Sequence, residues 1–88
     1  MPYIIHTTDK FQKHFKKLTD TEKAQLKNKL VLLSCNPLHP SLRTKKIQGT
    51  DDLFECSVNM DLRIIWYFEG NTIIITADVG HHDILKKY

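Results

Sequence analysis

The 88-residue chain has little cysteine, glycine or proline, with two cysteines, three glycines and three prolines. Cys35 and Cys56 are too few for a disulfide framework, and neither has the close Cys/His spacing of a zinc site. No stretch reaches the roughly 18 apolar residues that cross a bilayer, and the N-terminus does not read as a signal peptide. We therefore expect one cytoplasmic domain over residues 1–88, with no membrane, metal or small-molecule cofactor.

Common motifs of nucleotide-binding and hydrolytic sites are also missing. The sequence has no P-loop, no G-x-G-x-x-G, no G-x-S-x-G and no H-E-x-x-H. Any chemistry must therefore come from polar side chains that the fold brings together.

The net charge of +3 conceals an uneven distribution. Residues 1–49 contain ten Lys and Arg against three Asp and Glu, a net +7, whereas residues 50–88 contain three against seven, a net −4. Such asymmetry is consistent with a polyanionic partner for the basic half. A solvated, lysine-rich pair of helices explains it equally well.

Two helices are predicted in the first half of the chain. Phe11, Phe15 and Leu18 fall on one helical face, and Asp9 is the expected N-cap. A second helix begins at a capping box and ends before Asn36-Pro37. Only a short turn separates the helices, so we expect an antiparallel helical hairpin.

Short alternating segments predict strands elsewhere, at residues 3–7, 43–49, 54–60, 62–68 and 72–79. The order is β-α-α-β-β-β-β, and the short turns between the last strands imply an antiparallel meander. We therefore predict the α+β class: a small antiparallel sheet with the helical hairpin packed on one face and the other face open. The final residues form a short helix or tail.

Arg63 is a candidate site residue because it lies in the strand with the most continuous apolar character. A central-strand arginine requires a counter-charge. Either it forms a structural ion pair with Glu55, Asp61 or Asp78, or it binds an anion.

The segment after the last predicted strand carries titratable groups. His81 and His82 follow Gly80 and precede Asp83. Histidine transfers protons near neutral pH, and a neighbouring carboxylate orients it. Consecutive histidines point in different directions, so at most one serves a given site, and surface or capping roles are the alternative.

Other cations are candidates for RNA binding. Lys45 and Lys46 alternate in direction, so one of them faces the open side of the sheet, where a lysine can hold a phosphate. Lys86, Lys87 and Tyr88 supply two charges and a ring that can stack on a base, unless they form a frayed tail.

The order of these elements resembles the RelE/ParE toxin superfamily over nearly the whole chain. Its members read approximately as L-x-G, an aromatic-rich strand, R-x-[IV]-x-[YW], and an apolar strand ending in V-G-H. The matching segments here are Ile47-Gln48-Gly49, Leu53-Phe54-Glu55, Arg63-Ile64-Ile65-Trp66-Tyr67 and Val79-Gly80-His81-His82-Asp83.

The resemblance implies a small antiparallel sheet carrying two N-terminal helices. The RelE-like branch is the toxic half of type II toxin–antitoxin pairs and cleaves mRNA in the ribosomal A site. Cleavage proceeds by attack of the 2′-hydroxyl on the adjacent phosphate and needs no metal. The partners implied are an antitoxin encoded nearby, the ribosome and mRNA.

The C-terminal stretch looks closest to the YafQ-like branch, which assigns roles residue by residue. His82 takes the position of the general acid, and Asp61 acts as the base or orients one. Ser57 and Lys45 stand where that branch has further histidines, so lysine must do phosphate or proton work. Arg63 matches an arginine shared widely across the superfamily.

The resulting hypothesis is a ribosome-dependent mRNA endonuclease with His82, Asp61, Arg63 and Lys45 in catalysis. The expected RNA-binding residues are Lys46, Lys86, Lys87 and Tyr88. The alternatives are a ParE-like inhibitor of DNA gyrase without nuclease activity, and a degenerate member that still binds an antitoxin. In each case an acidic, helical antitoxin segment is expected over the open sheet face and the basic surface.

Overall fold

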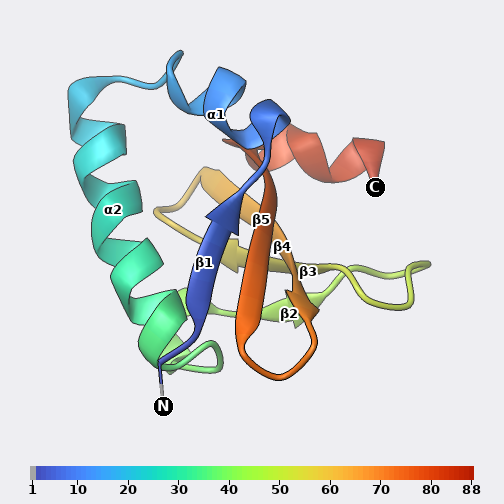
Figure 1. Ribbon diagram of the computed structural model, residues 1–88. Coiled ribbons are helices and arrows are strands. Elements are labelled where there is room, and N and C mark those ends of the chain that lie inside the picture. The colour runs from blue at the N-terminus through green and yellow to red at the C-terminus, as the bar shows by residue number, and fades with distance from the viewer. Residues whose placement is uncertain (1) are drawn as a thin grey trace.

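A five-stranded sheet forms the centre of the computed structural model, which describes residues 2–88 (Figure 1). The strand order is β1-β5-β4-β3-β2. The strands are β1 (Ile4–Thr7), β2 (Lys45–Lys46), β3 (Phe54–Ser57), β4 (Leu62–Glu69) and β5 (Ile73–His81). The helices are α1 (Asp9–Phe15), α2 (Asp20–Cys35) and two 3-10 helices, η1 (Pro40–Leu42) and η2 (His82–Lys87).

The predicted α+β class and the antiparallel meander are confirmed, because β2, β3, β4 and β5 pair antiparallel in sequence order. β1 extends the sheet by pairing with β5 in parallel, with Ile4 opposite Ile73. The connection between these two parallel strands contains both helices and strands β2, β3 and β4, which is longer than the dozen or so residues that a parallel pair needs.

The helix starts follow from side-chain capping. At α2 the predicted capping box is present, because Thr19 and Glu22 each accept the other's backbone N–H. At α1 the N-cap is Thr8 rather than Asp9, since Thr8 Oγ1 accepts the Phe11 N–H at 3.1 Å. A threonine hydroxyl placed before the first turn caps that N–H, so Asp9 becomes the first helical residue.

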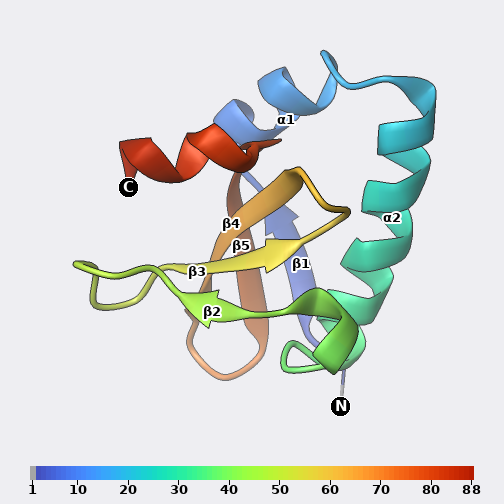
Figure 2. The same ribbon diagram turned by 180° about the vertical axis from the view of Figure 1, so that it is seen from behind.

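The two helices diverge from their connecting turn instead of lying side by side along their length. α1 crosses one end of the sheet close to η2, while α2 runs along the sheet from that end toward the other (Figures 1 and 2). The end of the sheet where β5 finishes is therefore enclosed by α1 on one side and η2 on the other.

Apolar residues pack on both faces of the sheet. The larger cluster lies under the helices and is centred on Trp66, Leu26 and Leu33, all fully buried. The smaller cluster, Ile47, Ile65 and Ile84, places η2 on the opposite face. The face predicted to be open is thus partly covered by the C-terminal residues.

Gly80 permits this close packing of η2 on β5. A Cβ atom added at Gly80 would stand 2.8 Å from Ile84 Cδ1. Among residues 2–88, no helix is both long and apolar enough to cross a membrane.

Candidate functional site

Asp61 joins two segments that are far apart in the sequence. It lies in the turn between β3 and β4, and its Oδ2 is hydrogen-bonded to Nδ1 of His81 at the end of β5. Its other oxygen, Oδ1, accepts the backbone N–H of His82 at 3.2 Å. One carboxylate therefore contacts both histidines that the sequence singled out.

The turn that carries Asp61 is held from two sides. Asn59 Oδ1 accepts the backbone N–H groups of Asp61 at 2.9 Å and Leu62 at 2.7 Å. Arg63 donates to the carbonyl oxygens of Asn59 at 2.8 Å, Met60 at 3.0 Å and Leu62 at 3.1 Å. Arg63 is thus a positioning residue for the turn.

Of the two alternatives for Arg63, the structural ion pair is not formed with any carboxylate in residues 2–88. The tight turn brings three backbone carbonyls within reach of the guanidinium, and these neutral acceptors occupy it instead. No carboxylate of residues 2–88 pairs directly with its positive charge, so the guanidinium can act on an anion.

The environment of Asp61 favours its ionised form. The backbone N–H of His82 and then the His81 side chain lower the pKa of the Asp61 carboxyl below its usual range, and Arg63 adds a smaller effect. A carboxyl with a lowered pKa is a weak proton acceptor at neutral pH. Asp61 is therefore better suited to orient a histidine than to act as the base itself.

Glu22 also faces the site, which the sequence did not indicate. Its Oε2 lies 3.6 Å from His81 Nε2, while its Oε1 accepts the Thr19 N–H. The capping-box pattern identified Glu22 only as part of the helix start. Its proximity to His81 depends on the tertiary placement of α2 beside the end of β5.

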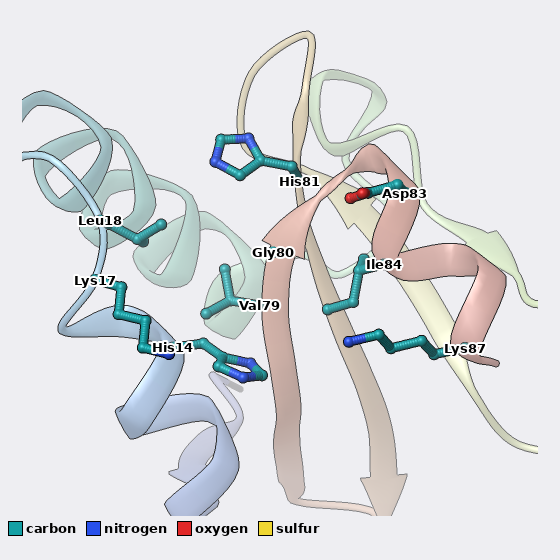
Figure 3. Close-up of a pocket in the computed structure, with 9 residues that line it drawn as sticks. All are labelled: His14, Lys17, Leu18, Val79, Gly80, His81, Asp83, Ile84 and Lys87. Atoms are coloured by element: carbon teal, nitrogen blue, oxygen red, sulfur yellow. The ribbon is translucent and has the colours of Figure 1, made fainter.

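A pocket of about 370 Å³ opens beside His81, between α1 and η2 (Figure 3). His14 and Lys87 point toward each other across it, and His81 and Asp83 lie at one end. Its lining residues are His14, Lys17, Leu18, Val79, Gly80, His81, Asp83, Ile84 and Lys87. The lining includes two lysines and two histidines but a single carboxylate, which makes the pocket suitable for an anion or a nucleobase.

A buried carboxylate underlies this region. Asp78 is fully buried, and it is bound by His14 Nδ1 at 2.5 Å, the Tyr88 hydroxyl at 2.7 Å and the Val79 N–H at 2.8 Å. Burial raises the pKa of Asp78, but these hydrogen bonds outweigh it and leave the pKa below the usual value. Asp78 is therefore an ionised anchor for α1 and the C-terminus.

The other predicted site residues form no hydrogen bond or ion pair with Asp61 in residues 2–88. Lys45 lies on edge strand β2, and its cross-strand partner is Glu55, whose own partner on β4 is Ile65. Cross-strand partners point to the same side of a sheet, so Lys45 lies on the side that η2 covers. Lys46 lies opposite Phe54 and faces the helix side.

The C-terminal residues differ from one another in placement. Lys86 and Lys87 are exposed on η2. Tyr88 is half-buried, and its hydroxyl is bound to Asp78 and Lys10. The tail is thus helical and anchored.

Comparisons with solved structures show the same fold at low identity. The chain superimposes on the archaeal RelE–RelB complex from Pyrococcus horikoshii with a TM-score of 0.77 and 17% identity, covering 93% of this chain and 97% of that chain. The E. coli DinJ–YafQ toxin–antitoxin complex gives a TM-score of 0.77 and 20% identity, covering 97% and 98%. A mutant of E. coli toxin RelE in the free state gives 0.77 and 21%, covering 99% and 93%.

Sequence comparison identifies the family. No curated protein matches the sequence. The family described as the bacterial toxin of type II toxin–antitoxin system, YafQ, matches residues 3–87, which is nearly the whole chain. Together with the shared fold, this match shows that the chain belongs to the YafQ family of type II toxin–antitoxin toxins.

Proposed function

We propose that this toxin is an endoribonuclease that cleaves mRNA on the ribosome by attack of a 2′-hydroxyl on the adjacent phosphate. The observation that carries the proposal is the contact of Asp61 with the His81–His82 segment, in a turn clamped by Arg63. The new O2′–P bond forms as the P–O5′ bond breaks. A general base takes the proton of the 2′-hydroxyl, a role that the His81 imidazole beside Asp61 can fill, and a general acid gives a proton to the 5′ oxygen.

His82 is our candidate for the acid that protonates the 5′ oxygen. Its backbone is fixed by Asp61, while its side chain is exposed and available to a substrate. His81 has its imidazole between Asp61 and Glu22, which suits it to positioning or proton relay. Arg63 and Lys45, on the same face of the sheet, would stabilise the extra negative charge on the phosphate.

A cognate antitoxin is the expected protein partner, as for other type II toxins. The solved relatives include complexes named DinJ–YafQ and RelE–RelB. The family model that matches is that of the YafQ toxin and not that of a gyrase inhibitor. No observation therefore favours the ParE-like alternative.

The test is primer extension on mRNA in programmed ribosomes, with wild type, His82→Ala, His81→Ala and the exposed control His6→Ala. We expect cleavage by wild type and His6→Ala, and a loss of about 100-fold or more in His82→Ala, as is typical for a general acid. Intact message with the wild-type protein would refute the proposal. Full activity in His82→Ala with loss in His81→Ala would assign the acid to His81.

A further inference from the structure

A second, smaller pocket borders the turn that carries Asp61. It has a volume of about 230 Å³. Helix α2, the segment around η1, strand β3 and the β3–β4 turn each contribute to its wall. The lining residues are Lys29, Ser41, Arg43, Ser57, Val58, Asn59, Met60 and Arg63.

The charges in this pocket are all of one sign. Lys29, Arg43 and Arg63 contribute three cations, and no carboxylate lines the pocket. Among the described residues none of the three forms an ion pair. Ser57 adds a hydroxyl group that can donate to an oxyanion, whereas the Ser41 hydroxyl is hydrogen-bonded to His39 Nδ1 at 3.0 Å.

Arg63 retains hydrogen-bonding capacity for a ligand. Three of its five N–H donors bind the turn carbonyls, which leaves two without an acceptor in residues 2–88. A guanidinium fixed by backbone carbonyls is also pre-oriented, so little side-chain entropy is lost when an anion binds.

Arg43 occupies a backbone conformation that favours glycine. Its φ of 50° makes it the one non-glycine residue with positive φ in the described chain, and its N–H bonds to Pro40 at 3.2 Å. This left-handed conformation is unfavourable for an arginine, because its Cβ comes close to the following carbonyl oxygen. The strain directs attention to the position, because strained residues concentrate at functional sites.

We infer that this pocket binds a phosphodiester group of RNA. The inference rests on the proposed function, and it assigns to Lys29 and Arg43 a binding role that complements the chemistry at His82. Because Asn59 and Met60 line the pocket and Asp61 follows them directly, a strand bound in the pocket would pass beside the turn that contacts His82. The ligand class is the anionic backbone, read without regard to base sequence.

The binding test uses a short single-stranded RNA with 2′-O-methyl groups throughout, which cannot be cleaved by 2′-hydroxyl attack. Its affinity is measured by fluorescence anisotropy over a range of salt concentrations. The variants are Lys29→Gln and Arg43→Gly. Arg43→Gly removes the charge and at the same time relieves the positive φ, so a binding loss cannot be attributed to a strained backbone.

Two controls are matched to these variants. Lys27→Gln makes the same charge change in the same helix, at an exposed position outside the pocket. Arg43→Lys keeps the charge at residue 43. We expect Lys29→Gln and Arg43→Gly each to weaken binding about tenfold and to lower the salt slope by about 0.7, the value for one phosphate on a single strand. Both controls should stay close to wild type.

Equal losses for Lys27→Gln and Lys29→Gln would overturn the inference, since they would indicate diffuse surface charge. A parallel measurement on programmed ribosomes separates the sources of the phosphate. If the variants bind the free oligonucleotide more weakly, the phosphate belongs to mRNA. If they bind more weakly only on ribosomes, the phosphate belongs to ribosomal RNA. Unchanged binding in both measurements would overturn the inference. If the wild-type protein leaves the message intact but the salt slopes of Lys29→Gln and Arg43→Gly still differ from wild type, the proposed function fails and the phosphate-binding pocket is still supported.

Discussion

The hydroxyl of Tyr88, the last residue, donates a 2.7 Å hydrogen bond to the fully buried carboxylate of Asp78. The same hydroxyl accepts from Lys10 Nζ at 3.0 Å, and His14 binds the other carboxylate oxygen of Asp78. Buried carboxylates are tolerated only when they are hydrogen-bonded. The C-terminus, α1 and β5 are therefore joined through one ionised side chain.

Tyr88→Phe should destabilise the protein by about 1–2 kcal/mol, because the buried carboxylate loses one of its donors. Urea unfolding followed by the fluorescence of Trp66 measures this change. The matched control is Tyr67→Phe, which removes a hydroxyl from a half-buried ring on β4. Since phenylalanine retains the ring, stacking on RNA would survive Tyr88→Phe, and an unchanged stability with reduced RNA affinity would contradict the anchoring role.

Acid should weaken the fold through Asp78. Its pKa is lowered in the folded protein, so it stabilises the fold above the unfolded pKa of about 3.9, and that contribution is lost as pH falls through the folded value. In urea titrations at several pH values, the stability difference between wild type and Asp78→Asn should be largest near neutral pH and shrink below about pH 4. A difference that is constant across this range would contradict this assignment.

Local signals were sufficient to predict most of the fold. The pairing of Thr19 with Glu22 marked the start of α2, and the alternation after Phe54 marked the meander. The parallel pairing of β1 with β5 was not predictable, because β1 has no turn to its partner and nothing within Ile4–Thr7 specifies which edge it joins.

The site was predictable only in part, and a single bulge shows why. Counting outward from the β4–β5 turn, Glu69 faces Ile73, and an unbroken register would put Gly80 opposite Leu62. An irregularity beside Trp66 leaves one extra residue in β5, so His81 faces Leu62 instead and reaches Asp61. The resemblance assigned roles to Asp61 and His82. In the structure Asp61 binds the backbone N–H of His82 and the imidazole of His81, and this shift brings that imidazole to the carboxylate.

Arg63→Lys should loosen the turn that carries Asp61 while preserving the charge. The planar guanidinium makes three hydrogen bonds to carbonyl oxygens of the turn, and a lysine ammonium cannot reproduce that geometry. We therefore expect the free energy of unfolding to fall by about 1–3 kcal/mol. Hydrogen exchange at the amides of Asp61 and Leu62 should accelerate more than exchange in β1. Unchanged exchange at both amides would show that Asn59 alone holds the turn.

The two cysteines should differ strongly in reactivity. Burial raises the pKa of the Cys56 thiol to about 12, whereas Cys35 is exposed. Because the thiolate is the reacting species, iodoacetamide at pH 8 should alkylate Cys35 alone in the folded protein and both cysteines in urea. Mass spectrometry counts the additions, and Cys35→Ser should take up none when folded. Modification of Cys56 in native buffer at the rate of Cys35 would contradict its burial.

Gly80→Ala should separate η2 from the sheet and displace His82 from Asp61. The added Cβ would lie 2.8 Å from Ile84 Cδ1 and 3.3 Å from Ile84 Cβ, so we expect a stability loss of about 1–3 kcal/mol from overpacking. Ile84→Val removes Cδ1 and alone should cost about 0.5–1.5 kcal/mol. If the clash with Cδ1 is the cause, the double variant should be more stable than the sum of the single losses predicts, and it should recover part of the RNA cleavage lost in Gly80→Ala. Additive losses in the double variant would show instead that the contact of residue 80 with Ile84 Cδ1 is not the cause of the loss.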